Sequence, residues 1–266
     1  TTGAQNTAVG RSALTNNTTA SNNTALGYQA ANSNTTGTII TALGRQALYN
    51  NTTGTNNTAV GYAMVSNTTG SNNTGIGHNA LHLNTTASSN VAVGYQSQYS
   101  GTVGNSNSTL GFSAMYSNVN GDRNVAIGTN ALYNMNPSSA NTDTYNTAVG
   151  AYALQLTTTG EDNTAIGGYA LLSNTTASYN TAVGHEASLS NTTGTENTSI
   201  GQGALRTNTT GNYNSATGNG ALRANTTGSS NVANGVAALF SNTTASNNTA
   251  VGKNAAYSTT TSSQGV

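Results

Sequence analysis

The chain has 266 residues, only 5% of them charged, and its six Lys and Arg residues balance its six Asp and Glu residues. A neutral chain with so few charges offers no field to attract nucleic acid, so we expect no nucleic-acid partner. Cysteine is absent, which excludes disulfides and thiolate metal sites, and no apolar run is long enough for insertion into a membrane.

One short unit repeats along almost the whole chain, with the consensus N-T-A-V-G-x-x-A-L-x-x-N-T-T-G-x-N. Its first glycine recurs at fourteen intervals, of which twelve are 17 residues, one is 16 and one is 22. The fifteen glycines are Gly10, Gly27, Gly44, Gly61, Gly77, Gly94, Gly111, Gly128, Gly150, Gly167, Gly184, Gly201, Gly218, Gly235 and Gly252. A fixed short period of this kind predicts a stacked repeat architecture.

The first predicted element of each unit is a short strand, beginning with residues 7–9. Thr7 and Val9 lie two residues apart and are β-branched, which suits one face of a pleated strand. The residue between them, Ala8, is small in nearly every unit. We expect the strand to be crowded on both faces, with the Ala rank packed tightly against a partner.

The rest of the unit contains a bend, a second apolar segment and a turn. The glycine ends the first strand, and Ala-Leu pairs such as residues 13–14 predict a second short strand. Asn-Thr-Thr-Gly then predicts a turn, because Asn can bond to its own backbone and Gly can adopt positive φ. Helices are disfavoured by the many Asn, Gly and β-branched residues.

Such a unit is too small to fold alone, so the sequence predicts an all-β, parallel β-solenoid of about fifteen 17-residue coils. Residues 1–266 form one repetitive domain, with repeats from about 6 to 258 and a five-residue insertion within 135–146. A single thin coil leaves no partner for the Ala rank. We therefore expect the same rank of other chains to cover it, in a homotrimer.

Residues 23–30 read N-T-A-L-G-Y-Q-A, and units of this form resemble the head repeats of trimeric autotransporter adhesins of the YadA type. They are also similar to repeats in bacteriophage tail fibres and related surface fibres. The resemblance implies a left-handed β-roll, with three chains intertwined or side by side and the strand lining the trimer axis. It also implies an extracellular location, at a bacterial surface or in a phage tail fibre.

Tyrosine is enriched at two positions of the unit that hold Arg, Lys, His or Gln elsewhere, so both positions should face solvent. Exposed Tyr suits contact with carbohydrate or protein, although Tyr is also a common residue on strand surfaces. The candidate contact residues are Tyr28, Tyr62 and Tyr95 after the glycine, and Tyr49, Tyr116 and Tyr133 beside the Ala-Leu pair.

The irregular stretch 135–146 contains Pro137, the only proline, and Asp143. Insertions in solenoids emerge as loops, often on the binding face, so these two residues are further candidate contacts; a neutral insertion is the alternative. We expect the insertion to project outward.

Nothing in the sequence points to catalysis. Glu161 and Asp162 are adjacent in a predicted turn, and His78 and His82 occupy variable outer positions, so we expect no enzyme activity, no cofactor and no metal. Ten Asn-Thr-Thr segments match the glycosylation acceptor pattern, but they are also good turn sequences.

A rank of Thr along a solenoid face can bind ice. Here Thr7, Thr24, Thr41 and Thr58 lie on a strand that we expect to be buried, and the outer Thr residues are adjacent, so their side chains should diverge. The sequence therefore argues against ice binding.

Two functions fit the sequence. The first is a non-enzymatic extracellular adhesion or receptor-binding fibre segment, with a cell-surface glycan or protein as partner. The alternative is a purely structural rod or polymerising filament whose binding tip lies elsewhere.

Overall fold

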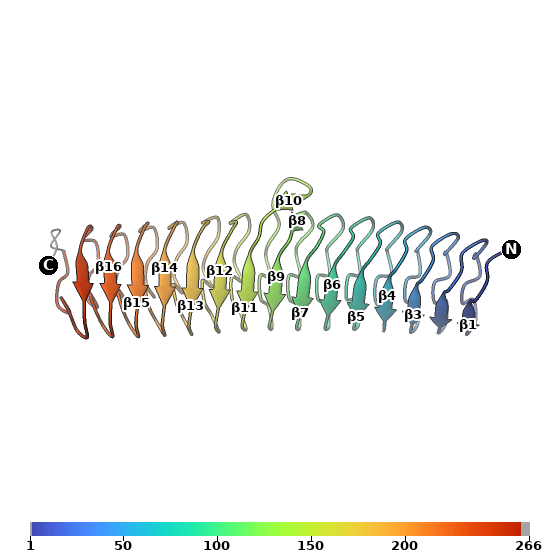
Figure 1. The fold of residues 1–266 in the computed structure, drawn as a ribbon, viewed down its shortest axis with the longest axis horizontal. Helices are drawn as coiled ribbons and strands as arrows, with labels where there is room; N and C mark the ends of the chain where they lie inside the picture. The colour runs from blue at the N-terminus through green and yellow to red at the C-terminus, as the bar shows by residue number, and fades with distance from the viewer. Residues whose placement is uncertain (1, 262–266) are drawn as a thin grey trace. The chain divides into compact units, whose positions relative to one another are not determined.

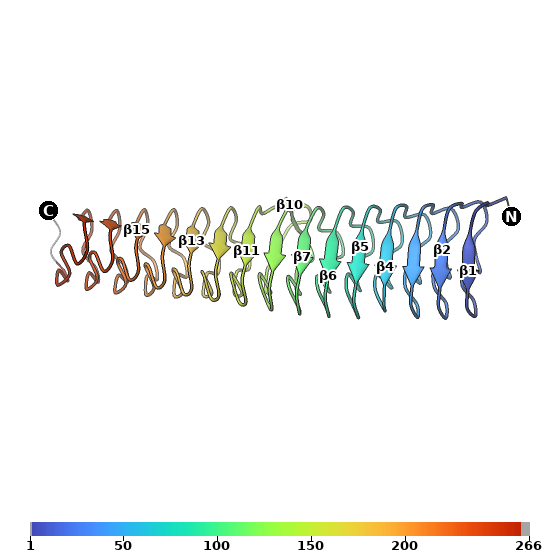
Figure 2. The ribbon, with the colours of Figure 1, turned by 60° about the horizontal axis from the view of Figure 1, so that its bottom comes forward.

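The computed structural model describes residues 2–261, and this part of the chain is all-β, without a helix. It contains two compact units, which are residues 1–126 with 136–143, and residues 127–135 with 144–266. Within each unit, consecutive strands pair in parallel and lie side by side (Figures 1 and 2). The prediction of a parallel β-solenoid with turns of about 17 residues is confirmed.

Unit 1 has one three-residue strand in each turn. They are β1 (Thr7–Val9), β2 (Thr24–Leu26), β3 (Thr41–Leu43), β4 (Thr58–Val60), β5 (Thr74–Ile76), β6 (Val91–Val93) and β7 (Ser108–Leu110). Strand β9 (Val125–Ile127) contains the boundary between the units, and β8 (Gly121–Asp122) and β10 (Thr142–Asp143) form a separate pair.

Unit 2 repeats the same arrangement. Its strands are β11 (Thr147–Val149), β12 (Thr164–Ile166), β13 (Thr181–Val183), β14 (Thr198–Ile200), β15 (Ser215–Thr217), β16 (Val232–Asn234) and β17 (Thr249–Val251). The register pairs each residue with its equivalent in the next turn, as Thr164 pairs with Thr181.

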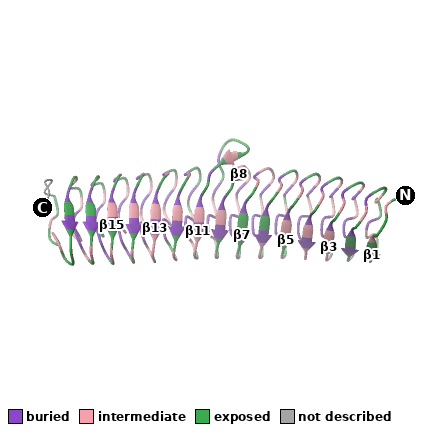
Figure 3. Cartoon of the chain, viewed as in Figure 1, coloured by how far each residue is buried: buried purple, intermediate pink, exposed green. Residues whose placement is uncertain are grey.

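The core of each turn lies inside the chain's own coil. The Ala at the centre of a strand, such as Ala42, is fully buried and clusters with the Ala47 and Leu48 pair that follows the glycine. The flanking strand residues are partly or fully exposed, so the strands carry both buried and accessible positions (Figure 3). The expectation that the Ala rank needs a second chain is therefore wrong, because the turn itself supplies its partner.

The Ala-Leu segment is a turn rather than the predicted second strand. Gln46 and Leu48 adopt positive φ of 55° and 53°, which curls the backbone and brings the Leu side chain inside. This region is unusual for residues with a branched side chain. Here it is supported by burial of Leu48 and by a hydrogen bond from its N–H to the Ala63 carbonyl of the next turn, at 3.2 Å.

Two ladders of asparagine amides run along each unit. In the Asn-Thr-Thr ladder, Asn51 Nδ2 donates to Asn34 Oδ1 at 2.9 Å and to the Gly54 carbonyl at 3.0 Å. In the other ladder, Asn73 Oδ1 accepts from the Asn90 N–H at 3.0 Å. The first ladder confirms that the Asn bonds to its own turn.

Burial also distinguishes the two interpretations of the Asn-Thr-Thr segments, as glycosylation acceptors or as turns. Nine of the ten Asn-Thr-Thr asparagines are buried, and their amide groups lie inside the coil: Asn34, Asn51, Asn67, Asn84, Asn174, Asn191, Asn208, Asn225 and Asn242. In the folded chain these Asn residues therefore serve as turn residues, and their amides are not accessible as glycosylation acceptors.

The repeat glycine is required by a close backbone approach. A Cβ on Gly44 would lie 2.5 Å from the carbonyl oxygen of Gly61, and Gly44 has a φ of +134°. Gly168, in contrast, has an ordinary φ, and its nearest atom would be His185 Cδ2 at 3.5 Å.

We predict that Gly44→Ala lowers the free energy of unfolding by about 1–3 kcal/mol or more. The new Cβ would overlap the Gly61 carbonyl oxygen, and the φ of residue 44 is disfavoured for Ala. Gly168→Ala is the matched control and should change the free energy of unfolding little. Urea unfolding followed by circular dichroism measures both. Equal stability of the two variants would contradict the close approach.

Candidate functional site

The first candidate site is a column of stacked aromatic rings on unit 1. It follows the residue after the repeat glycine, where Tyr62, His78, Tyr95 and Phe112 succeed one another along the coil. Their ring centroids lie 5.4, 5.7 and 5.3 Å apart in that order. The one-to-one register places each ring over the next at nearly the strand spacing, so the stack follows directly from the repeat.

A second column lies at the fifth residue after the glycine. His82, Tyr99 and Tyr116 stack here with centroid distances of 5.3 and 5.1 Å. Tyr62 contacts both columns, since its ring centroid is 5.4 Å from that of His78 and 5.4 Å from that of His82. Its turn is the one that is a residue shorter, with a single residue between Gly61 and Ala63.

We call these two columns together the aromatic ladders. Except for Tyr62, which is tilted by 32° against His78 and by 34° against His82, the neighbouring rings are nearly parallel. They therefore present edges, Tyr hydroxyls and imidazole nitrogens to solvent rather than open faces. Tyr95 and Phe112 are 46% and 53% exposed. The surface therefore combines apolar edges with hydrogen-bonding groups at regular intervals.

Cations extend the aromatic surface toward β1. The Arg45 Cζ lies 5.7 Å from the Tyr62 ring centroid, and the Arg11 Cζ lies 5.9 Å from that of Tyr28. A guanidinium over an aromatic ring is attracted by the ring quadrupole. The predicted residues Tyr28, Tyr62 and Tyr95 are thus all accessible, and each contacts its neighbour of the same column.

The second predicted set is less exposed. Tyr49, Tyr116 and Tyr133 are all half-buried, with Tyr116 in the second column. His78, His82 and Phe112 were not predicted as contact residues, although all three occupy the two repeat positions at which Tyr is enriched. Equivalence of position in the repeat was the signal that could have identified them.

Unit 2 carries shorter stacks. Tyr152 and Tyr169 are 5.1 Å apart between centroids, and His185 meets Tyr169 edge-on at 5.8 Å. Phe240 stacks on Tyr257 at 5.0 Å. These pairs are not continued over as many turns as in unit 1, so unit 1 is the better candidate for an extended contact surface.

The insertion belongs to unit 1 and projects near β8 and β10 (Figure 1). Its β10 pairs in parallel with β8, and Asn120 Nδ2 donates to the Pro137 carbonyl at 2.9 Å. Pro137 is buried, so its prediction as a contact residue is wrong: the residue is covered where the insertion docks on the preceding turn.

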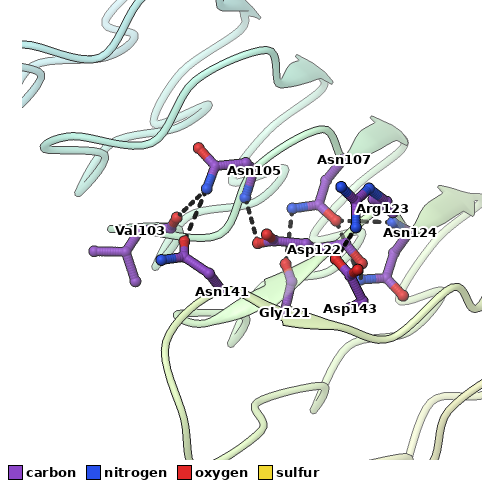
Figure 4. Close-up of polar contacts among 9 residues, drawn as sticks. All are labelled: Val103, Asn105, Asn107, Gly121, Asp122, Arg123, Asn124, Asn141 and Asp143. Carbon is purple, nitrogen blue, oxygen red and sulfur yellow. Dashed lines mark hydrogen bonds and ion pairs between the residues drawn. The ribbon is translucent and has the colours of Figure 1, made fainter.

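Asp143, the other candidate of the insertion, is exposed and forms an ion pair with Arg123 (Figure 4). Nearby, the Asn105 N–H donates to Asp122 Oδ1 at 2.7 Å, and Asn105 Nδ2 donates to Asn141 Oδ1 at 2.9 Å. Burial raises the pKa of Asp122, and the Asp143 carboxylate adds to this effect. These contacts join the insertion to the turns before it.

Within residues 2–261, no group of three or more His, Cys, Asp or Glu side chains is arranged to hold a metal ion. The same residues contain no helix long and apolar enough to cross a membrane. Comparison with known proteins finds no family model and no curated relative that matches this chain.

His82 gives the ladders a measurable pH dependence. Burial among the rings lowers the pKa of His82, and the neighbouring His78 lowers it further. The unfolded chain therefore takes up a proton at this residue more readily than the folded chain. The resulting contribution to stability is complete above the unfolded pKa of about 6.5 and is lost as the pH falls below it.

We predict that His82→Tyr removes this component, because Tyr99 and Tyr116 show that the position accepts Tyr. His78→Tyr, as control, should leave most of it, since burial is the larger cause. The measurement is the difference in unfolding free energy between about pH 7.5 and about pH 5.5, on either side of the unfolded pKa. An unchanged difference in His82→Tyr would show that His82 is not its source.

Proposed function

We propose that this chain is a non-enzymatic, extracellular adhesion or receptor-binding fibre segment, and that the aromatic ladders of unit 1 are its contact surface. The observation that carries the proposal is the exposed stack of His78, Tyr95 and Phe112, which the half-buried Tyr62 continues at one end. Regularly spaced ring edges and hydroxyls suit a repetitive partner, a cell-surface glycan or protein. Weak contacts repeated along the coil add up to firm attachment.

The low charge of the chain supports the same proposal. Six cations balance six anions over 266 residues, so a partner recognised by this surface is held by aromatic and hydrogen-bonding contacts. Such binding depends little on ionic strength, unlike binding to nucleic acid. The resemblance of the repeat to surface-fibre repeats favours a bacterial surface or a phage tail fibre as its location.

The proposal includes self-association through the outer face of the strands, in a homotrimer. The third residue of most three-residue strands is aliphatic and accessible, and Val9, Leu26 and Leu110 are 55%, 50% and 50% exposed in unit 1; in β15 and β16 the position holds Thr217 and Asn234. In unit 2, Ile166 and Ile200 are 41% and 42% exposed. An extended apolar rank favours burial against another copy of the chain. The interface thus uses the residues on either side of the buried Ala.

The alternative is a purely structural filament whose binding tip lies elsewhere. The observation that favours it is the use of side-chain amides between turns, as in the bonds of Asn208 to Asn191 and of Asn225 to Asn208, both 2.8 Å. Such ladders stiffen the coil without contributing to binding.

We predict that Tyr95→Ser with Phe112→Ser abolishes most binding of the chain to its cell-surface or glycan partner. Tyr179→Ser is the matched control, because Tyr179 is 60% exposed and lies outside the ladders. Binding to cells and glycan arrays is measured at low and high salt. Equal loss in the control, or strong salt dependence, would contradict the proposed surface, and absence of wild-type binding would favour the structural alternative.

For the trimer, we predict that Leu26→Lys with Ile76→Lys gives a folded monomer, because three chains would bring the added charges together. Ile39→Lys is the control: Ile39 is 58% exposed but lies outside the strands. Light scattering measures the mass, and circular dichroism checks the fold. A monomeric wild-type chain would refute the trimer.

A further inference from the structure

A second regular surface of unit 1 lies on the Asn-Thr-Thr turns, away from the residues of the aromatic ladders in the repeat. In each of five turns the second Thr is exposed, the next residue is buried and the following Ser or Thr is half-buried. The residue between them is buried, so both hydroxyl residues lie on the outer side of the turn. We call these pairs the turn face: Thr19 and Ser21, Thr36 and Thr38, Thr53 and Thr55, Thr69 and Ser71, Thr86 and Ser88.

Backbone hydrogen bonds hold the turn face at a constant spacing. The N–H groups of Thr35, Thr52 and Thr68 each donate to the equivalent carbonyl of the next turn, and all three distances are 2.9 Å. The Thr36 N–H reaches the same Thr52 carbonyl at 3.2 Å. Each rank therefore repeats at about the 4.8 Å spacing of hydrogen-bonded strands.

The hydroxyls of neighbouring ranks have different partners. The first Thr of each Asn-Thr-Thr segment, which is not part of the turn face, is used between turns, as Thr52 Oγ1 donates to the Thr68 carbonyl at 3.0 Å. The half-buried rank is held as well, since Ser71 Oγ accepts from the Thr55 N–H at 3.0 Å. In the described part of the chain, no hydrogen bond engages the hydroxyls of the exposed rank: Thr19, Thr36, Thr53, Thr69 and Thr86.

The turn face contains no ionisable side chain. The exposed residues that follow its second rank are also neutral, being Asn22, Ile39, Asn56, Asn72 and Ser89. In unit 2 the equivalent exposed Thr rank is continuous, but it is flanked by the carboxylates of Glu161, Asp162 and Glu196 at neighbouring positions. Charges orient water around themselves, whereas an uncharged array leaves the water layer to be ordered by hydroxyls and methyl groups.

We infer that the turn face of unit 1 binds ice. Its exposed Thr rank offers one free hydroxyl and one methyl group per turn, and the second rank supplies a fixed parallel row of hydroxyls. The repeat of about 4.8 Å is close to the repeat of water molecules along the a axis of hexagonal ice. Each hydroxyl can bond a water molecule while the methyl groups hold the intervening water, so the first water layer matches the crystal.

Adsorption through this face goes beyond attachment to a cell surface and uses none of the ladder residues. Single contacts between a hydroxyl and lattice water are weak, and repetition over five turns makes adsorption persistent. The adjacent residues Thr52 and Thr53 differ in exposure and in the partners of their hydroxyls, and the two ranks of the turn face are formed by residues two apart, such as Thr53 and Thr55.

The test is ice affinity of the full chain, measured as the protein retained in slowly grown ice and as inhibition of ice recrystallisation. The wild type should be retained and inhibitory. The triple variant Thr36→Tyr, Thr53→Tyr and Thr69→Tyr should lose both properties, because three bulky rings break the array. Thr53→Tyr alone, a milder change should the triple variant not fold, is expected to show a partial loss.

The matched control is the triple variant Arg11→Tyr, Arg45→Tyr and His78→Tyr. These three residues are exposed and share a repeat position with Tyr28 and Tyr95. This control should keep its ice affinity, and circular dichroism should show the same fold in all variants. Exclusion of the wild type from ice overturns the proposal, as does retention of the triple variant or equal loss in the control. Loss of glycan binding alone in the triple Thr variant would also overturn it and would assign the turn face to a sugar.

Discussion

The structure depends on one constraint, which is that the backbone of each turn is hydrogen-bonded to the next turn in one-to-one register. Every residue must therefore tolerate its own equivalent about one strand spacing away. Gly44 shows how strict this is, since the carbonyl of Gly61 lies where a Cβ would be, 2.5 Å away. The same contact recurs for Gly27 against Gly44 at 2.4 Å. Glycine is thus repeated because the neighbouring turn leaves no room for a side chain.

Stacking like on like also selects the polar side chains. An amide can both donate and accept, so Asn67 can bond to Asn51 while its own oxygen accepts from Asn84, at 2.7 and 2.6 Å. Carboxylates and ammonium groups cannot stack on themselves without repulsion. This explains a chain with 5% charged residues, in which Glu186 faces Arg206 at 2.7 Å rather than another acid. Aromatic rings tolerate self-stacking as well, which is why they form columns.

The sequence was sufficient to predict the repeat, the parallel register and the place of the insertion, because each follows from spacing. It was not sufficient to predict which strand face is buried. Leu48 and its equivalents adopt a backbone region that Leu rarely occupies, and only contacts with the neighbouring turns stabilise it. With Leu turned inside, the coil fills its own core and the flanking Thr and Val residues face outward. Pro137 was misplaced for a similar reason, since docking of the insertion on residues 119–123 leaves no local signal.

Because position in the repeat determines position on the surface, the unit of function in such a chain is the rank and not the single residue. The strand face, the aromatic ladders and the turn face are formed by different positions of the same 17-residue unit. Each can change without altering the buried Ala, Leu, Asn and Gly ranks that hold the coil together. The Thr rank illustrates this independence, since it is flanked by uncharged residues in unit 1 and by Glu161 and Glu196 in unit 2. The buried Asn ladder of the same turns keeps the same bonds in both units, as Asn51 and Asn208 show. A surface property of this chain is consequently a matter of how many successive turns keep the same outer residue.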